Sequence, residues 1–101
     1  MLVICSGTHE EAAYEDVLGA GALCDAVWEQ FAGGHIADSA QVAREIFKQG
    51  RGDLLAAVQR ARNARRLLAL PELCDDVAFC LQRDTVPLVA GMRSDGAVRR
   101  E

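Results

Sequence analysis

The sequence predicts one α/β domain in which several helices cover a small mixed sheet. Three observations support this: a short apolar run near the amino terminus, several segments with apolar residues at helical spacing, and a carboxyl-terminal segment with strand and turn signals. With 101 residues, half of them apolar, the chain has the length of one domain and can bury roughly two thirds of its unfolded surface. We therefore treat residues 1–101 as one domain.

The first predicted element is a strand at residues 2–5, although a run this short does not by itself exclude a fragment of a helix. Apolar residues at helical spacing then predict a helix over residues 14–31, which two glycines end. Gly19 and Gly21 lie inside this helix, where glycine is costly, and so indicate close packing against another helix.

Three more helices follow in the prediction. Asp38 with Gln41 has the pattern of a capping box and predicts a helix over residues 39–49. Asp53 opens the next one, which extends to residue 68 before Pro71, and a shorter one covers residues 72–83 with Val77, Cys80 and Leu81 on its inner face.

The end of the chain has the features of a hairpin. Residues 86–90 are predicted as a strand, residues 94–96 as a turn, and residues 97–99 as a returning strand. One strand at the start and a hairpin at the end make a small sheet with several helices to cover. This combination suggests part of a larger α/β layer rather than a complete one.

Composition limits the functional classes. The net charge is −4, no segment resembles a signal peptide, and no apolar run approaches the roughly 20 residues that span a bilayer. We expect a cytoplasmic protein with neither a membrane nor a nucleic acid as partner. The four cysteines form no C-x-x-C pair, so we expect reduced, mostly buried thiols: Cys5, Cys24, Cys74 and Cys80.

Charge is unevenly distributed along the chain. Residues 1–43 contain no lysine or arginine, whereas residues 44–66 carry six arginines and one lysine. The first part would attract cations and the second anions, or the two could be solvated helix faces that attract each other. Arg65 and Arg66 are candidates for contacting a substrate anion, although arginine-rich helix faces are more often solvated or paired with acids.

The most informative stretch follows the first predicted strand. Small residues, hydroxyls and backbone N–H groups at residues 5–8 would lie at the carboxyl end of a strand, where α/β sheets tend to bind ligands. Glu15 and Asp16 then stand in the first turn of a helix, where they either stabilise the positive end of the helix dipole or hold a hard cation such as Mg²⁺. Both readings stay open on these residues alone.

Several known phosphate-binding patterns are absent. A thiolate phosphatase loop starting at Cys5 would need an arginine where this chain has Glu11, and no Gly-Lys-Ser/Thr segment of the Walker A type occurs. The aspartates near residues 75–84 lack the Asp-x-Asp-x-Thr spacing of aspartyl-phosphate enzymes. His9 could act as a general acid or base, but a lone histidine in a loop is more often only a polar residue.

A string of short motifs runs along essentially the whole chain: Ile4-Cys5-Ser6-Gly7-Thr8, Tyr14-Glu15-Asp16 with Ala20-Gly21, Asp38-Ser39-Ala40, Asp75-Asp76-Val77-Ala78-Phe79-Cys80, and Asp84 with Val86-Pro87. In their order and spacing, these motifs resemble the C-terminal half of the 2-phosphosulfolactate phosphatase family. The resemblance implies part of a larger three-layer α/β/α fold and a Mg²⁺-dependent hydrolysis of 2-phosphosulfolactate to sulfolactate and phosphate, a step towards coenzyme M.

Carried over by residue, the resemblance implies a function for two groups. Glu15 and Asp16 would be the catalytic metal ligands. The substrate, a small phosphorylated and sulfonated acid, would be bound by Cys5, Ser6, Gly7 and Thr8, and we add Arg66. Asp75, Asp76 and Asp84 are expected to be helix-start and loop carboxylates.

Departures from the family pattern leave a second reading open. His9-Glu10-Glu11 stands where the family usually has a glycine shortly after its Ser/Ala-Gly-Thr, and the family's Asp-x-x-Arg-Ala stretch, from its N-terminal half, is missing. The site would then be incomplete without a complementary N-terminal half or a further copy of the chain. The alternative is a truncated, non-catalytic remnant or interaction module of the same fold.

Overall fold

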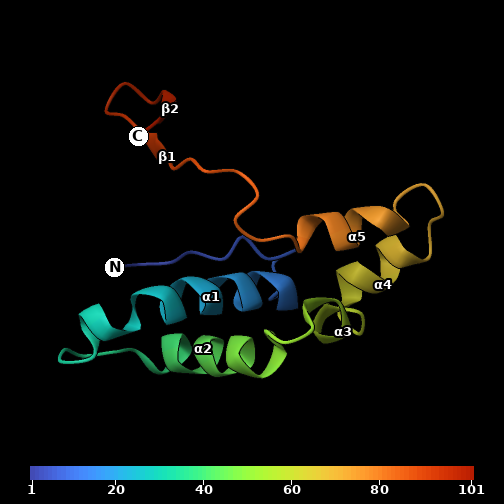
Figure 1. Cartoon of the computed structure of the whole chain (residues 1–101), viewed down its shortest axis with the longest axis horizontal. Helices are drawn as coiled ribbons and strands as arrows, with labels where there is room; N and C mark the ends of the chain where they lie inside the picture. Colours follow the sequence, from blue (N-terminus) through green and yellow to red (C-terminus); the bar gives the residue numbers. More distant parts are fainter.

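The computed structural model describes every residue from Met1 to Glu101. Its elements are α1 (Tyr14–Phe31), α2 (Asp38–Gly50), α3 (Leu54–Val58), α4 (Arg62–Leu68), α5 (Cys74–Cys80), β1 (Ala90–Met92) and β2 (Val98–Arg100). The helices form one elongated body and the β-hairpin stands apart from it (Figure 1). Helices therefore dominate a fold that has a small sheet, as predicted in part, but the sheet is antiparallel and uncovered rather than mixed and covered by helices.

The core is small and draws on all five helices. Each helix contributes one buried side chain to a single cluster, which consists of Leu18, Phe47, Val58, Ala64 and Val77. Only 10 of the 101 residues are buried in total. The cluster explains why the predicted helix over residues 53–68 is broken into α3 and α4. Val58 and Ala64 are six residues apart, so on one continuous helix they would point roughly 120° apart and could not both face the core.

Helices α1 and α2 pack closely at a glycine. A Cβ atom on Gly21 would collide with the backbone carbonyl of Ala43 and with the Phe47 side chain. The predicted packing role of Gly21 is thus confirmed. The same prediction for Gly19 is wrong, because nothing lies within 4 Å of the position its Cβ would occupy.

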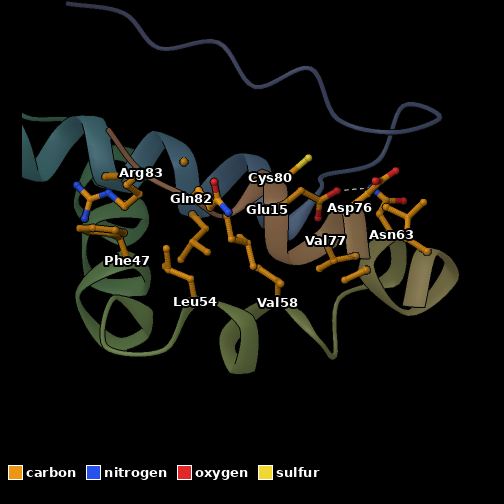
Figure 2. A pocket seen from close by; sticks show the side chains of 16 residues that line it. Glu15, Phe47, Leu54, Val58, Asn63, Asp76, Val77, Cys80, Gln82 and Arg83 are labelled. Atoms are coloured by element: carbon orange, nitrogen blue, oxygen red, sulfur yellow. Dashed lines mark hydrogen bonds between the residues drawn. The ribbon is translucent and has the colours of Figure 1, made fainter. Parts of the chain in front are cut away.

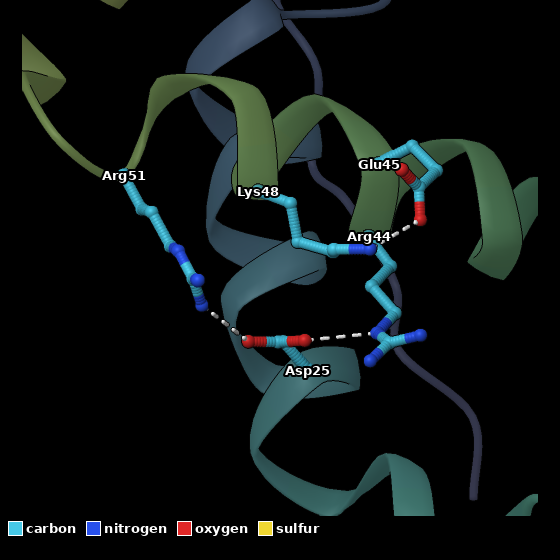
Figure 3. Close-up of polar contacts among 5 residues, drawn as sticks. All are labelled: Asp25, Arg44, Glu45, Lys48 and Arg51. Carbon is cyan, nitrogen blue, oxygen red and sulfur yellow. Dashed lines mark hydrogen bonds and ion pairs between the residues drawn. The ribbon is translucent and has the colours of Figure 1, made fainter.

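Ion pairs join the acidic first helix to arginines within and just after the second one. Asp25 of α1 accepts a hydrogen bond from Arg44 at 2.8 Å and lies 3.6 Å from Arg51, while Lys48 pairs with Glu45 on the exposed side of α2 (Figure 3). The Arg44 guanidinium also stacks 4.1 Å from the centre of the Trp28 ring. Part of the charge asymmetry is therefore used for attraction between helix faces.

The helix starts confirm one predicted cap and correct another. Asp53 caps α3 as predicted, since its carboxylate accepts from the Ala56 N–H at 2.9 Å. The capping box at Asp38 is wrong, because α2 begins at Asp38 itself and its N-cap, Ala37, has no side-chain acceptor. The Gln41 amide donates to the Ile36 carbonyl at 3.3 Å and to the Asp38 carboxylate at 3.5 Å. No helix is both long enough and apolar enough to cross a bilayer.

The thiols are less buried than expected. All four cysteines are free, but only Cys24 is buried, and Cys5 and Cys80 are exposed. Cys80 ends the short α5, whose inner face consists of Val77 and Leu81 instead.

The two ends of the chain contain fewer strands than predicted. Residues 2–5 run along α1 without strand pairing, because no other strand of the chain lies beside them (Figure 1). The hairpin starts only at Ala90, which pairs with Arg100, and Met92 pairs with Val98. The turn between the strands is where it was predicted, with Gly96 at φ 79°.

Candidate functional site

A tight turn at residues 8–11 forms the centre of the site. Thr8 and Glu11 exchange backbone hydrogen bonds of 2.9 and 3.1 Å, and the two residues between them, His9 and Glu10, have φ values of 52° and 64°. Such values are typical of a two-residue hairpin turn, but they cost roughly 1–2 kcal/mol for each non-glycine residue. Gly7, at φ 71°, is required beside the turn because a Cβ atom there would lie 2.6 Å from the Glu11 carbonyl oxygen.

The first turn of α1 holds this loop from one side. An oxygen of the Asp16 carboxylate accepts a hydrogen bond from the Gly7 N–H at 2.7 Å. Its neighbour Glu15 points about 100° away around the helix and accepts from the Asn63 amide. Both carboxylates are partly buried. They therefore lie beside the loop, as expected from the sequence, although each already has one protein donor.

The first residues of α4 hold the loop from the other side. The Asn63 amide donates to the Thr8 hydroxyl at 2.9 Å as well as to Glu15. The Arg62 guanidinium donates to the Thr8 carbonyl at 3.2 Å and forms an ion pair with Glu11. Since the Thr8 hydroxyl accepts from Asn63, its own hydrogen remains free to donate to a ligand.

Sequence reasoning missed Arg62 and Asn63. They contact residues that precede them by roughly 50 positions, and no local pattern distinguishes them from the other polar residues of an arginine-rich segment. The predicted Arg66 is exposed and makes no hydrogen bond or ion pair with the loop. It lies one helical turn beyond Arg62, so the two arginines share a face of α4.

A cavity of about 350 Å³ opens beside the carboxylate of Glu15. Its walls are mostly apolar side chains from the core cluster. Glu15, Asn63 and Asp76 lie at one end of it, and Arg83 lies over the Phe47 ring at the other, 5.2 Å from the ring centre (Figure 2). Gly19 borders the cavity, which accounts for the open space at this glycine.

The arrangement brings together some of the predicted residues. Gly7 bonds to Asp16, and Thr8 and Glu15 are joined through the Asn63 amide. Cys5 and Ser6 are exposed just before Gly7 and have no hydrogen-bond partner in the chain, so the Ser6 hydroxyl is free to bind an anion. The N–H groups of Gly7, Thr8 and Glu11 already donate within the chain.

The loop and the start of α1 offer few ligands for a divalent cation. No group of three or more His, Cys, Asp or Glu side chains lies close enough together to hold a metal ion. Two carboxylates and the Thr8 oxygen suit Mg²⁺ chemically, because Mg²⁺ prefers oxygen ligands and commonly keeps several waters and substrate phosphates in its shell. The oxygen ligands are therefore of the type that Mg²⁺ prefers, but too few of them lie close together to make a complete site.

Comparisons with known proteins show which family the chain is similar to. The sequence profile described as 2-phosphosulpholactate phosphatase matches residues 1–95. A protein of Gloeobacter violaceus named probable 2-phosphosulfolactate phosphatase is 33% identical over 96 residues, which are 95% of this chain and 38% of that protein. A protein of the same name from Pseudothermotoga lettingae is 33% identical over 99 residues, 97% of this chain and 42% of that protein. No solved structure gave a significant match.

The loop and its helices thus belong to a class of phosphatases. The chain is a member of the 2-phosphosulfolactate phosphatase family, as its resemblance indicated. It spans about two fifths of the length of the curated relatives it matches.

Proposed function

We propose that this chain carries the phosphate- and metal-binding part of a Mg²⁺-dependent phosphatase that hydrolyses 2-phosphosulfolactate to sulfolactate and phosphate, a step towards coenzyme M. The observation that carries the proposal is the hydrogen-bonded loop at residues 7–11. In it, Thr8 accepts a hydrogen bond from Asn63 of α4, and the carboxylates of Glu15 and Asp16 lie beside the loop. Family membership and the names of the relatives support the substrate. A cytoplasmic location belongs to the same proposal and agrees with four free cysteines.

Each residue has a defined part in this proposal. Glu15 and Asp16 hold Mg²⁺, which when bound neutralises phosphate charge and activates water. The hydroxyl groups of Ser6 and Thr8 donate hydrogen bonds to the phosphate oxygens. Asn63 orients the Thr8 hydroxyl, and Arg62 supplies the fixed positive charge. Arg66, one turn further along the same face, can contact a second anionic group of the substrate.

Glu11 acts against anion binding in this arrangement. Its carboxylate pairs with Arg62 and therefore takes the place that a phosphate oxygen would otherwise occupy on the guanidinium. The pair is largely exposed, with 38% of the Arg62 and 67% of the Glu11 side chain accessible, so exchange for a dianion is inexpensive. Replacing Glu11 by glutamine should raise the affinity for phosphate.

The test is the release of inorganic phosphate from 2-phosphosulfolactate, with Mg²⁺ and with a chelator. The Glu15→Gln, Asp16→Asn double variant should lose metal-dependent turnover and Mg²⁺ binding by calorimetry. Glu29→Gln, an exposed carboxylate at the other end of α1, is the matched control and should change neither. Undiminished Mg²⁺ binding by a folded double variant would contradict the assignment of the metal ligands.

A non-catalytic module of this family is the second candidate. It is favoured by the lack of any group of three or more His, Cys, Asp or Glu side chains close enough together to hold a metal ion. A chain that unfolds cooperatively, binds no Mg²⁺ and releases no phosphate, both alone and when joined to the part of a relative that lies outside the matched region, would establish this candidate.

A further inference from the structure

The structure leaves more surface accessible than a complete domain of its mass. A folded monomer of 10.9 kDa is expected to expose about 5,600 Å², whereas this chain exposes 7758 Å². Its radius of gyration is 15.2 Å, compared with about 13 Å for a compact domain of this length. The excess of about 2,000 Å² is more than twice the roughly 800 Å² that one partner buries in a typical stable interface.

Part of the exposed apolar surface lies at residues 2–5. The Leu2 and Ile4 side chains are each 82% exposed, while Val3 between them is half-buried against α1 and α2. Alternate side chains thus point to opposite sides, and both sides are apolar. Such a segment has the pattern of an interior strand of a sheet, covered on both faces.

The backbone of the same segment has no partner. No N–H or C=O group of residues 1–6 takes part in a hydrogen bond within the chain. In Figure 1 the segment runs along one side of α1, with no strand next to it. An apolar segment with an unpaired backbone is a template for pairing with another strand.

We propose that residues 2–5 are an inner strand of a sheet completed by polypeptide equivalent to the part of the relatives that lies outside the matched region. That part makes up about three fifths of each curated relative. It would dock by adding strands to the backbone of residues 2–5 and by placing an apolar layer over Leu2 and Ile4. The surface at residues 2–5 that receives this polypeptide is the same whether the polypeptide belongs to the same longer chain or to a separate one.

A second copy of this chain fits the surface less well. If residues 2–5 of two copies paired as antiparallel strands about an axis perpendicular to the sheet, both helical layers would cover the same face. Leu2 and Ile4 of both copies would then remain exposed on the other face. If instead the copies packed through Leu2 and Ile4, the backbone of residues 1–6 would stay unpaired. One partner that supplies both strands and a covering layer satisfies both requirements.

The test uses the part of the Gloeobacter violaceus relative outside the 96 matched residues, co-expressed with this chain or fused ahead of Met1. Light scattering after gel filtration measures the stoichiometry, and amide hydrogen exchange locates the contact. We expect a 1:1 complex and at least tenfold slower exchange at residues 2–6, in the complex and in the fusion.

Two variants distinguish docking at residues 2–5 from non-specific hydrophobic association. Ile4→Asp should weaken the complex by at least tenfold, whereas Met92→Asp, a similarly exposed apolar position in the hairpin, should leave it unchanged. Both side chains are exposed, so neither variant should unfold the isolated chain. A homodimer that protects residues 2–6, equal effects of the two variants, or a fusion in which residues 2–6 still exchange freely would overturn the proposal. These readouts do not depend on phosphatase activity, so they remain decisive even if the proposed reaction is wrong.

Discussion

The α1–α2 pair and the segment at residues 2–5 both carry large apolar side chains, but these are buried in the helix pair and exposed in the segment. In the helix pair, Leu18 and Phe47 are 4% and 3% exposed, and Gly21 allows the two backbones to approach closely. In the segment, Leu2 and Ile4 are 82% exposed. A helix satisfies its own backbone, and only its apolar face must find a neighbour, which the short loop to the next helix supplies. A strand depends on a neighbour for its backbone as well, so it remains unpaired until that neighbour is present.

The largest expected effect comes from emptying the core of the helical body. Phe47→Ala should lower the free energy of unfolding by about 3–5 kcal/mol, because it leaves a cavity where all five helices meet. Phe79→Ala, at a position 70% exposed, should change it by less than about 0.5 kcal/mol. Urea unfolding followed by circular dichroism measures both. If Phe47→Ala does not fold, Phe47→Leu should retain the fold at a cost below about 1.5 kcal/mol, and similar losses at positions 47 and 79 would contradict the described core.

Two glycines of α1 provide an intermediate test. Gly21→Ala should destabilise the chain by about 1–3 kcal/mol, because the new methyl group meets the Ala43 carbonyl and pushes α2 away. Gly19→Ala has open space and should stabilise the helix by up to about 1 kcal/mol. Opposite shifts in thermal midpoint are therefore expected from the same substitution two residues apart. Shifts of the same sign would mean that the helices are not packed as described.

The smallest effects concern ion pairs in the two regions. Asp25→Asn should cost about 1 kcal/mol, since the half-buried carboxylate interacts with both Arg44 and Arg51. Asp95→Asn in the hairpin removes an exposed pair with Arg99 and should cost less than about 0.5 kcal/mol. The loss at Asp25 should shrink as salt is added. Equal losses at low salt would show that burial between α1 and α2 contributes nothing to the pair.

Some residues of the candidate site could be predicted from their neighbours in the sequence, and others could not. Gly7, Glu15 and Asp16 were predictable because a small-residue turn followed by carboxylates at a helix start has a local pattern. Arg62 and Asn63 were not, because they reach the loop only after α2 and α3 bring the start of α4 next to it. The sequence therefore pointed to Arg66, whose charge is the same but which lies one turn too far along α4 to contact the loop.

By itself, the sequence determined the family, the boundaries of α1, the Asp53 cap, the hairpin turn and the position of the acidic helix start. All of these depend on spacing and residue type within a few positions. Only the tertiary structure decided that the third predicted helix breaks into α3 and α4, that Arg62 and Asn63 hold the loop, and that residues 2–5 have no strand beside them. These features depend on contacts between residues far apart in the chain, which local periodicity does not encode.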